Sequence, residues 1–328
     1  MRLFLTGATG FVGLNLLLEA QKSGRYTEIV VAVRDGDKLL RQLAAENIAD
    51  TAVMRITPWD APPPAGIDHA VHCAGVLFAR NRDDYFRVNV DDTLRLLNAL
   101  PATAKIVVLS SQAAAGPTPA GRKIRTAADP DTPITWYGES KLAMEKTLRA
   151  TRPDALILRP PMILGPRDRA TLPLFRMAAG PLRIKPGRAP KSYSWIAVRD
   201  LVSGILNALG SSAESPLAAC CPEPITDIEL IETAAQILGR RGKTIALPHP
   251  FIRGMSAIVD AIPALRAAAP SLTRDRARDI FADLWVIDGA AFRSRFAPGP
   301  FATLRETLAE TAAWYARAGL LEMPARIT

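Results

Sequence analysis

Short apolar runs alternate with segments of helical periodicity through the first half of the chain. The runs typical of buried strands are Arg2–Leu5, Ile29–Val33, His69–His72, Lys105–Leu109 and Ala155–Leu158. Apolar residues that recur every three to four positions predict helices over Leu14–Ala20, over Tyr85–Leu100 and from Tyr137 to Leu148. Strands that alternate with helices predict an α/β fold, built on a doubly wound parallel sheet.

The second half of the chain is expected to form a smaller lobe. We assign residues 1–160 to the sheet domain and 161–328 mainly to a substrate-binding lobe, with 192–210 returning to the sheet domain. Within that returning segment, Tyr193–Ile196 is expected to rejoin the main sheet. Asp200 is expected to cap a helix over Leu201–Leu209.

Two capping boxes predict the starts of further helices. Thr226 with Glu229, and Thr303 with Glu306, have the required three-residue spacing. The first of these helices is expected to stop near Gly239, since glycine commonly follows the last helical turn.

Another helical stripe runs through Phe251–Leu265, at Ile252, Met255, Val259 and Ile262. A stripe of this kind usually packs into a core. Alternatively, it lines a pocket for an apolar substrate. A shallow membrane contact is the weaker alternative, because the segment lacks a basic polar face.

Composition narrows the class of protein. The chain has 328 residues, of which 48% are hydrophobic, which is ample for a large core. We expect no membrane-spanning helix, because no apolar run reaches the roughly eighteen residues that spanning requires. The first strand begins at Arg2, which leaves no room for a signal peptide. Three cysteines are too few for a disulfide framework, so we expect a cytoplasmic protein with reduced thiols.

The net charge of +9 raises the question of nucleic-acid binding. The positive residues are dispersed, however, so we expect no nucleic-acid partner and interpret the charge as a field that favours anionic small molecules. Residues 159–191 are denser, with eight basic residues against one acidic residue, Asp168. This segment is either a solvated loop near cofactor phosphates or a binding site for an anionic substrate, through Arg167, Arg169, Arg176 and Arg183.

A glycine-rich turn joins the first strand to the first helix. Gly7 allows a tight turn, Gly10 allows close approach of the backbone to a pyrophosphate, and Gly13 allows the helix to pack closely on the strand. The free N–H groups at the start of the helix provide an anion site. The turn therefore predicts dinucleotide binding, although a glycine-rich turn without a ligand is the alternative. We also place Thr9, Phe11 and Val12 of this turn at the cofactor.

The end of the second strand bears on the choice of cofactor. Enzymes that use NAD usually have an acidic residue here for the ribose hydroxyls. This chain has Arg34, with Lys38 four residues later, and a guanidinium fits a 2′-phosphate. The pattern favours NADP, while Asp35 leaves NAD possible.

Other strand ends add candidates for cofactor binding. Cys73, Ala74 and Gly75 are small residues that follow the third of these strands, and Pro160 follows the last. Asp60 is a candidate acceptor for the adenine amine. The histidines of His69–His72 have no triad or metal-ligand spacing, so we expect them to be structural and predict no metal site.

The segment Tyr137–Lys141 indicates acid/base chemistry. Positions four apart share a helix face, so a phenol and an ammonium can lie side by side. A nearby positive charge favours the phenolate and lowers the tyrosine pKa toward neutrality. Ser110 and Ser111 emerge at the carboxyl end of a strand, where parallel sheets bind ligands. Asn89, inside a helix, is by spacing alone as consistent with a surface position as with a site.

The chain resembles the extended, or epimerase/dehydratase-like, short-chain dehydrogenase/reductases over nearly its whole length. The motifs that carry the resemblance are TGATGFVG at 6–13, HCAG at 72–75, VNVDDT at 88–93, LSSQAAAGP at 109–117, WYGESKLAMEK at 136–146, LRPPMILGPRD at 158–168, YSWIAVRDL at 193–201 and LRETLAETAAWYARAGLL at 304–321.

The resemblance implies roles for four residues. Ser111 binds the reacting oxygen, and Tyr137 donates or accepts the proton. Lys141 lowers the tyrosine pKa and holds the nicotinamide ribose, and Asn89 shapes the floor of the site. Ser110 is the rival to Ser111, which we prefer because its offset to Gly116 matches the family serine.

Two departures from the family pattern narrow the chemistry. Gln112 and Ala113 stand where family dehydratases have an Asp-Glu pair, so sugar dehydration is not expected. Arg34 argues against the tightly held NAD of sugar epimerases. The pattern is most similar to the 3-beta-hydroxysteroid dehydrogenase and dihydroflavonol reductase branch.

These observations predict an NADP-dependent oxidoreductase that transfers a hydride between nicotinamide and a carbonyl or secondary alcohol of a small, largely apolar substrate. An NAD-dependent sugar-nucleotide epimerase is the first alternative, and a non-catalytic dinucleotide-binding protein is the second. The family resemblance also makes a homodimer possible.

Overall fold

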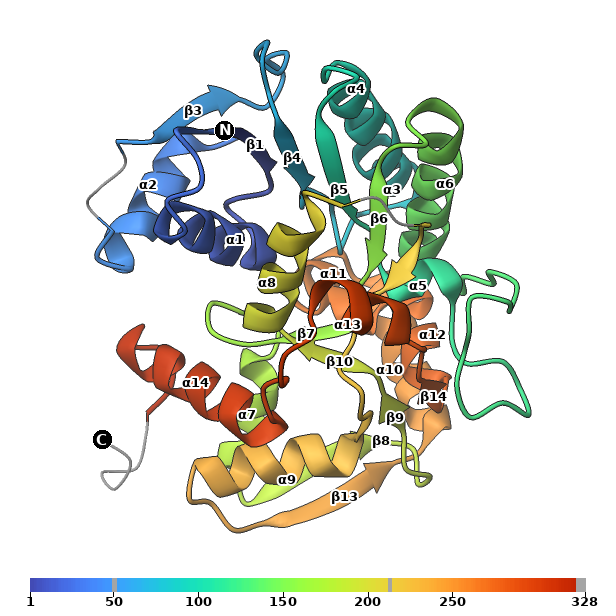
Figure 1. Cartoon of the computed structure of the whole chain (residues 1–328). Coiled ribbons are helices and arrows are strands. Elements are labelled where there is room, and N and C mark those ends of the chain that lie inside the picture. Colours follow the sequence, from blue (N-terminus) through green and yellow to red (C-terminus); the bar gives the residue numbers. More distant parts are fainter. Residues whose placement is uncertain (49–51, 212–213, 323–328) are drawn as a thin grey trace.

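The computed structural model describes residues 1–48, 52–211 and 214–322. Its centre is a sheet of seven parallel strands in the order β11-β6-β5-β4-β1-β2-β3 (Figure 1). The strands are β1 (Arg2–Thr6), β2 (Glu28–Val33), β3 (Met54–Pro58), β4 (His69–His72), β5 (Lys105–Leu109), β6 (Leu156–Arg159) and β11 (Leu217–Ala218). The doubly wound α/β fold is confirmed.

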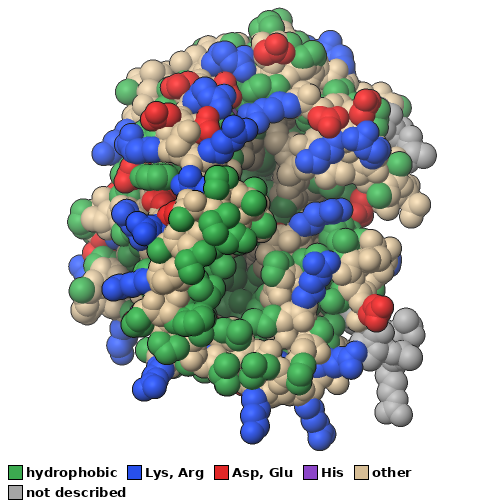
Figure 2. Space-filling view, turned by 180° about the vertical axis from the view of Figure 1, so that it is seen from behind, with side chains coloured by type: hydrophobic (Ala, Val, Ile, Leu, Met, Phe, Trp, Pro, Cys, Tyr) green, Lys and Arg blue, Asp and Glu red, His purple; other side chains and the backbone are tan. Residues whose placement is uncertain are grey.

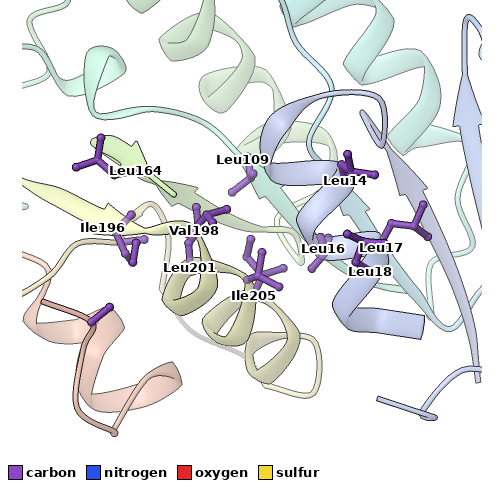
Figure 3. Close-up of a cluster of buried hydrophobic side chains, with 14 of the residues drawn as sticks. Leu14, Leu16, Leu17, Leu18, Leu109, Leu164, Ile196, Val198, Leu201 and Ile205 are labelled. Carbon is purple, nitrogen blue, oxygen red and sulfur yellow. The ribbon is translucent and has the colours of Figure 1, made fainter. Parts of the chain in front are cut away.

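Helices cover both faces of this sheet because successive strand residues point to opposite sides. In β1, Leu3 and Leu5 belong to one buried cluster and Phe4 to the other. The first cluster includes residues of α1 (Phe11–Lys22), α2 (Gly36–Ala45) and α8 (Val198–Ala208), several of which are drawn in Figure 3. The second includes residues of α4 (Asp92–Asn98) and α6 (Trp136–Thr151).

The helix predicted over Tyr85–Leu100 is present, but it starts earlier and is not uniform. It begins as α3 (Arg82–Phe86), which Asn81 caps, and continues through a π-helical turn, η1 (Arg87–Asp91), into α4. Such π turns often occur at functional sites. Here the turn contains the buried Asn89.

The expectation that Tyr193–Ile196 rejoins the main sheet is wrong. This segment forms β9 (Ser192–Tyr193) and β10 (Trp195–Ala197), which belong to two small separate sheets. The free edge of β6 is taken instead by β11, which pairs with it in parallel. The helix that follows, α8, does pack on α1. The boundary near residue 160 stays a prediction.

The capping role expected for Asp200 is also wrong. Strand β10 runs directly into α8, so Asp200 already lies in the first helical turn. Its carboxylate instead accepts a hydrogen bond of 2.9 Å from the backbone N–H of Ala302.

The second half of the chain forms small sheets and short helices beneath the main sheet in Figure 1. Both predicted capping boxes are confirmed, at Thr226 and Thr303, and the first of the two helices ends just before Gly239. The remaining elements are α5 (Gln112–Ala115), β7 (Met162–Leu164), α7 (Leu172–Ala179), β8 (Leu182–Pro186), β12 (Ile225–Thr226), α9 (Asp227–Ile237), β13 (Lys243–Leu247), α10 (His249–Ala261), α11 (Pro263–Ala268), η2 (Pro270–Leu272), α12 (Arg274–Phe281), β14 (Leu284–Trp285), α13 (Ala290–Phe296) and α14 (Leu304–Arg317).

The stripe predicted over Phe251–Leu265 is split between two helices. Ile262 adopts an extended conformation because the proline that follows it disfavours helical geometry. Ile252 and Val259 are buried, whereas Ile262 is exposed, so only part of the stripe packs into a core. Among the described residues, no helix combines the length and apolarity needed to span a bilayer.

Candidate active site

The candidate residues gather at one edge of the sheet. Because the strands are parallel, their carboxyl ends lie side by side, and each is followed by part of the site. The predicted residues at this edge are Gly7, Thr9, Gly10, Phe11, Val12 and Gly13 after β1, Arg34 and Lys38 after β2, Asp60 after β3, Cys73, Ala74 and Gly75 after β4, Ser111 after β5 and Pro160 after β6.

The glycine turn has the geometry of a phosphate cradle. Gly7 has a φ of 77°, and a Cβ on it would lie 2.6 Å from the backbone nitrogen of Ala74. A Cβ on Gly13 would lie 2.2 Å from the carbonyl oxygen of Gly7. No side chain caps the start of α1, and its first turn contains no acidic residue, so the helix N–H groups are available to an anion. The turn therefore fits a dinucleotide pyrophosphate.

At the end of β2, an arginine and an acidic residue have different surroundings. The exposed Arg34 guanidinium lies over the Trp59 ring, 5.4 Å from its centre, and 3.7 Å from the Asp92 carboxylate. The Asp35 carboxylate caps α2 by accepting a hydrogen bond of 2.8 Å from the backbone N–H of Lys38. The Asp35 carboxylate thus stabilises the start of α2, while the Arg34 guanidinium remains largely exposed to solvent.

Asp60 lies at the far side of this region. Its side chain is exposed, and its backbone carbonyl accepts a hydrogen bond from the Arg95 guanidinium. The role expected for Asp60 at an adenine amine stays a prediction.

Asn89 connects the loop after β4 to α6. Its Oδ1 accepts a hydrogen bond of 2.8 Å from the Val76 N–H, and its Nδ2 donates to the Val76 carbonyl and to Ser140 Oγ. A Cβ on Gly75 would lie 3.1 Å from Asn89 Oδ1 and 3.2 Å from Lys141 Nζ. Gly75, Asn89 and Lys141 therefore meet at the floor of the site, where a larger residue at 75 would clash.

The two serines after β5 point to different partners. Ser110 is buried, and its hydroxyl donates a hydrogen bond to Glu145. The Ser111 hydroxyl accepts from the Ala113 N–H at 3.1 Å and is also a hydrogen-bonding neighbour of the Tyr137 phenol, where it lowers the phenol pKa. This geometry favours Ser111 over Ser110 for contact with a substrate.

The expectation that Lys141 lowers the pKa of Tyr137 is not met in the chain alone. Burial raises the pKa of the phenol above its usual value of 10.0, and it outweighs the opposing effects of Ser111 and of Arg276. The cation that faces the phenol ring is Arg276, at 5.4 Å from its centre. The Lys141 Nζ is turned instead toward the strand end, where it donates a hydrogen bond of 2.9 Å to the Leu109 carbonyl.

Lys141 is itself strongly affected by its surroundings. Burial lowers its pKa from 10.5 to about 8, while Glu145 and Cys73 act in the opposite direction. A buried ammonium with a pKa near 8 is still mostly charged at neutral pH, so it supplies a positive charge at the carboxyl edge of β5.

Sequence reasoning missed a network of buried charged residues around Glu145 of α6. Glu145, which is fully buried, accepts two hydrogen bonds from the Arg159 guanidinium, at 2.9 and 2.6 Å. Arg159 also forms a bidentate pair with Asp131. The network joins α6, the end of β6 and the loop before α6. The spacing of Glu145 four residues after Lys141 was the available signal.

Sequence reasoning also missed α12, which lies over the phenol. Asp275 accepts a hydrogen bond from the backbone N–H of Trp136, at the start of α6. Arg276 lies between the rings of Tyr137 and Phe78, at 5.4 and 5.5 Å. Burial raises the pKa of Asp279 to about 6. These residues are some 140 positions from Tyr137 in sequence, and no local pattern links them to it.

The two strand histidines are structural, as expected. The ring nitrogens of His72 lie 3.0 and 2.9 Å from the hydroxyls of Thr6 and Thr93. His69 lies 3.1 Å from the Tyr26 hydroxyl. Burial lowers the pKa of His72 to about 3, so its ring is neutral.

The arginines of the basic segment 159–191 do not all lie together. Arg167 and Arg169 line a cavity of about 1340 Å³ beside the glycine turn, together with Lys38. Arg167 is already bonded there to Asn15 and Glu46. Arg176 and Arg183 do not line this cavity.

The strands, the glycine cradle and the residues at the sheet edge define a dinucleotide-binding enzyme of the doubly wound class. The profile described as "NAD dependent epimerase/dehydratase family" matches residues 3–217, and the chain belongs to this family. The resemblance to the extended short-chain dehydrogenase/reductases, and the prediction of an enzyme of that type, are confirmed.

Individual relatives include both reductases and epimerases. A protein described as "Ceramide reductase" from Caulobacter vibrioides is 28% identical, with 97% of this chain and 95% of that protein covered. An ADP-L-glycero-D-manno-heptose-6-epimerase from Pseudomonas paraeruginosa is 32% identical, over 51% of this chain and 53% of that protein. The structure of UDP-glucuronic acid 4-epimerase from Bacillus cereus in complex with NAD matches with a TM-score of 0.75 at 15% identity, over 97% of this chain and 99% of that one, which shows the shared fold.

Proposed function

We propose that the protein is an NADP-dependent reductase of a carbonyl group on a small, largely apolar substrate, and of the corresponding alcohol in reverse. The observation that carries the proposal is the meeting of Ser111 and the partly buried Tyr137 at the edge of the sheet that holds the glycine turn. Lys141 lies one helical turn beyond Tyr137. The full-length similarity to a ceramide reductase supports a lipid-like substrate.

Reduction adds a hydride to the carbonyl carbon and a proton to its oxygen. A nicotinamide bound at this edge supplies the hydride. The Ser111 hydroxyl donates a hydrogen bond to the carbonyl oxygen, and the Tyr137 phenol gives that oxygen its proton. A phenol whose pKa is raised by burial stays protonated at neutral pH, which suits a proton donor in the reducing direction. Lys141 provides the positive charge and a donor for the ribose hydroxyls.

The preference for NADP rests on Arg34. Its guanidinium is exposed beside the start of α2, where a 2′-phosphate would follow the ribose, and Lys38 adds a second charge. The carboxylate of Asp35, the residue that would favour NAD, caps α2 by accepting a hydrogen bond from the Lys38 N–H. Family membership supports a nicotinamide dinucleotide in general.

The test is Tyr137→Phe, assayed with NADPH and long-chain or sterol ketones. Loss of the proton donor should lower kcat by about 10²–10⁴-fold, with dinucleotide affinity nearly unchanged. Tyr85→Phe is the matched control, because that ring lies 6.2 Å from the Tyr137 ring and its hydroxyl donates a hydrogen bond to the backbone carbonyl of Leu77. Turnover retained in the Tyr137 variant would remove the mechanism.

An NAD-dependent sugar-nucleotide epimerase is the second candidate, because a relative and several structural neighbours are epimerases. Such an enzyme recycles its cofactor, so the purified protein would contain tightly bound NAD and would consume no external dinucleotide. Net oxidation of added NADPH by a ketone excludes it.

A further inference from the structure

Helices α10 and α11 expose an unusual amount of apolar surface. Phe251 is 58% exposed, Ile258 56%, Ile262 43% and Leu265 39%. We call these four side chains the α10–α11 apolar surface. None of the residues of α11 is buried, and residues 261–265 form an unbroken run of exposed apolar positions. Exposed patches of this kind mark interaction sites in soluble domains.

The surface follows from the helical period rather than from poor packing. Ile252, Ser256 and Val259 of α10 point inward and are buried. Phe251 and Ile258, seven residues apart, share another, exposed face of α10, and the exposed Ile262 follows the end of the helix. The helix therefore has two apolar faces, of which only one is covered.

The charges around this surface are of one sign. Arg253, Arg274 and Arg278 are exposed and form no salt bridge with the described residues, although Arg253 also lies over the Phe281 ring and Arg278 donates a hydrogen bond to the Ile134 carbonyl. The acidic residues of the same segment are all partly or fully buried, and each is engaged: Asp260 with Arg266 and the Arg274 N–H, Asp275 with the Trp136 N–H, and Asp279 with Arg276. The basic residues that the stripe itself lacks are thus supplied largely by α12, which packs against α10.

The surface is also close to the candidate active site. Figure 2 shows the hydrophobic side chains gathered beside the hollow that runs down this face of the molecule. α12 continues from this region to Tyr137, where Arg276 contacts the phenol ring and the partly exposed Phe78.

We propose that the α10–α11 apolar surface docks on a lipid bilayer that carries anionic headgroups. The apolar side chains insert at the level of the headgroups, and Arg253, Arg274 and Arg278 pair with lipid phosphates. An apolar substrate then passes from the bilayer into the hollow without crossing water. Docking goes beyond the proposed function, because it requires no catalysis.

The experiment is cosedimentation of the full chain with vesicles of phosphatidylcholine containing about one third phosphatidylglycerol, and with vesicles of phosphatidylcholine alone. We expect binding to the anionic vesicles that weakens as salt is added. The double variant Ile258→Glu/Ile262→Glu should reduce the partition coefficient about tenfold or more, since it removes two inserted side chains and adds two repelled charges. Phe251→Glu provides a second, independent variant.

Leu40→Glu is the matched control. Leu40 is 47% exposed on α2, in the other half of the molecule, so this variant should bind vesicles as the wild type does. The variant Arg253→Gln/Arg274→Gln should weaken binding to anionic vesicles and change binding to neutral ones little.

Three outcomes would overturn the proposal: no binding by the wild type, equal binding by the Ile258/Ile262 variant, or a dimer in solution that this variant dissolves. The last would show that a second copy covers the surface. Tyr137→Phe should bind vesicles normally, so failure of docking and failure of the reductase mechanism are distinguishable.

Discussion

The guanidinium of Arg276, from α12, lies 5.4 Å from the centre of the Tyr137 ring, from α6. Among the described charges that act on the Tyr137 phenol, this cation lowers the phenol pKa, whereas Asp279 raises it. The second lobe thereby contributes to the acid/base properties of a residue in the sheet domain.

Replacing Arg276 should therefore move the pH profile. The cation favours the phenolate, so Arg276→Met raises the pKa of Tyr137 further. Alcohol oxidation needs the phenolate as base, and its kcat/KM should fall several-fold near neutral pH and recover at more alkaline pH. The measurement is kcat/KM against pH, with Arg276→Lys, which keeps the charge, as the control. Profiles that coincide for wild type and Arg276→Met would contradict the assignment.

Arg34→Ala should weaken NADPH binding far more than NADH binding. An Arg–phosphate pair of this kind is expected to account for about tenfold in affinity or more. Tryptophan fluorescence titration with both dinucleotides measures the ratio. Arg41→Ala is the control, because Arg41 lies on α2, shortly after Arg34, but pairs with Asp35. An unchanged ratio would mean that Arg34 does not recognise the 2′-phosphate.

Glu145→Gln should destabilise the fold. The change removes the buried negative charge beside the Arg159 guanidinium, which is 7% exposed, while the pair with Asp131 remains. Losing charged hydrogen bonds of this kind typically costs about 1.5–3 kcal/mol. Urea unfolding measures the free energy of unfolding. Glu139→Gln is the control, since its pair with Arg82 is partly exposed and should contribute about 1 kcal/mol or less. Similar losses in the two variants would show that the network is not stabilising.

His72 should make the protein sensitive to acid. Burial, with Lys141 as a second cause, lowers its pKa to about 3, against 6.5 when unfolded. Below pH 6.5, His72 binds a proton in the unfolded state but stays neutral in the folded state. The free energy of unfolding therefore falls as the pH drops from 6.5 toward 3.

Between pH 6.5 and 3, His72 lowers the free energy of unfolding by at most about 1.4 kcal/mol for each unit by which the pH falls. Above pH 6.5 it has no effect on the slope. The variant His72→Gln should lose this component, so the free energy of unfolding should depend less steeply on pH than in the wild type. Equal slopes between pH 6.5 and 3 would indicate that His72 is protonated in the folded protein.

The central sheet could be predicted from sequence because its signals are local. The β-branched run before Arg34 and the glycines from Gly7 to Gly13 specify strand and turn by the conformations that those residues allow, with no help from distant residues. The two capping boxes, at Thr226 and Thr303, succeeded for the same reason. The carboxyl ends of parallel strands meet at one edge, so the grouping of the site followed from the strand assignment alone.

The failures concern choices between distant partners. Tyr193–Ile196 has strand character, but it cannot pair with the edge of β6 because β11 occupies that edge. Asp200 has the residue type of a cap, yet β10 runs into α8 before reaching it. Nothing local records either fact.

The sequence by itself determined the type of fold, the phosphate turn and the Tyr137–Lys141 pair as candidates, because helix periodicity and glycine conformation are properties of short segments. Ser111 was preferred to Ser110 only through the family resemblance. Only the tertiary structure decided that Arg276 rather than Lys141 faces the phenol ring, and that the Ser110 hydroxyl donates its hydrogen bond to Glu145. Arg276 and Tyr137 lie more than a hundred residues apart in the chain, and burial and charge proximity created by such distant contacts shift the pKa of Tyr137.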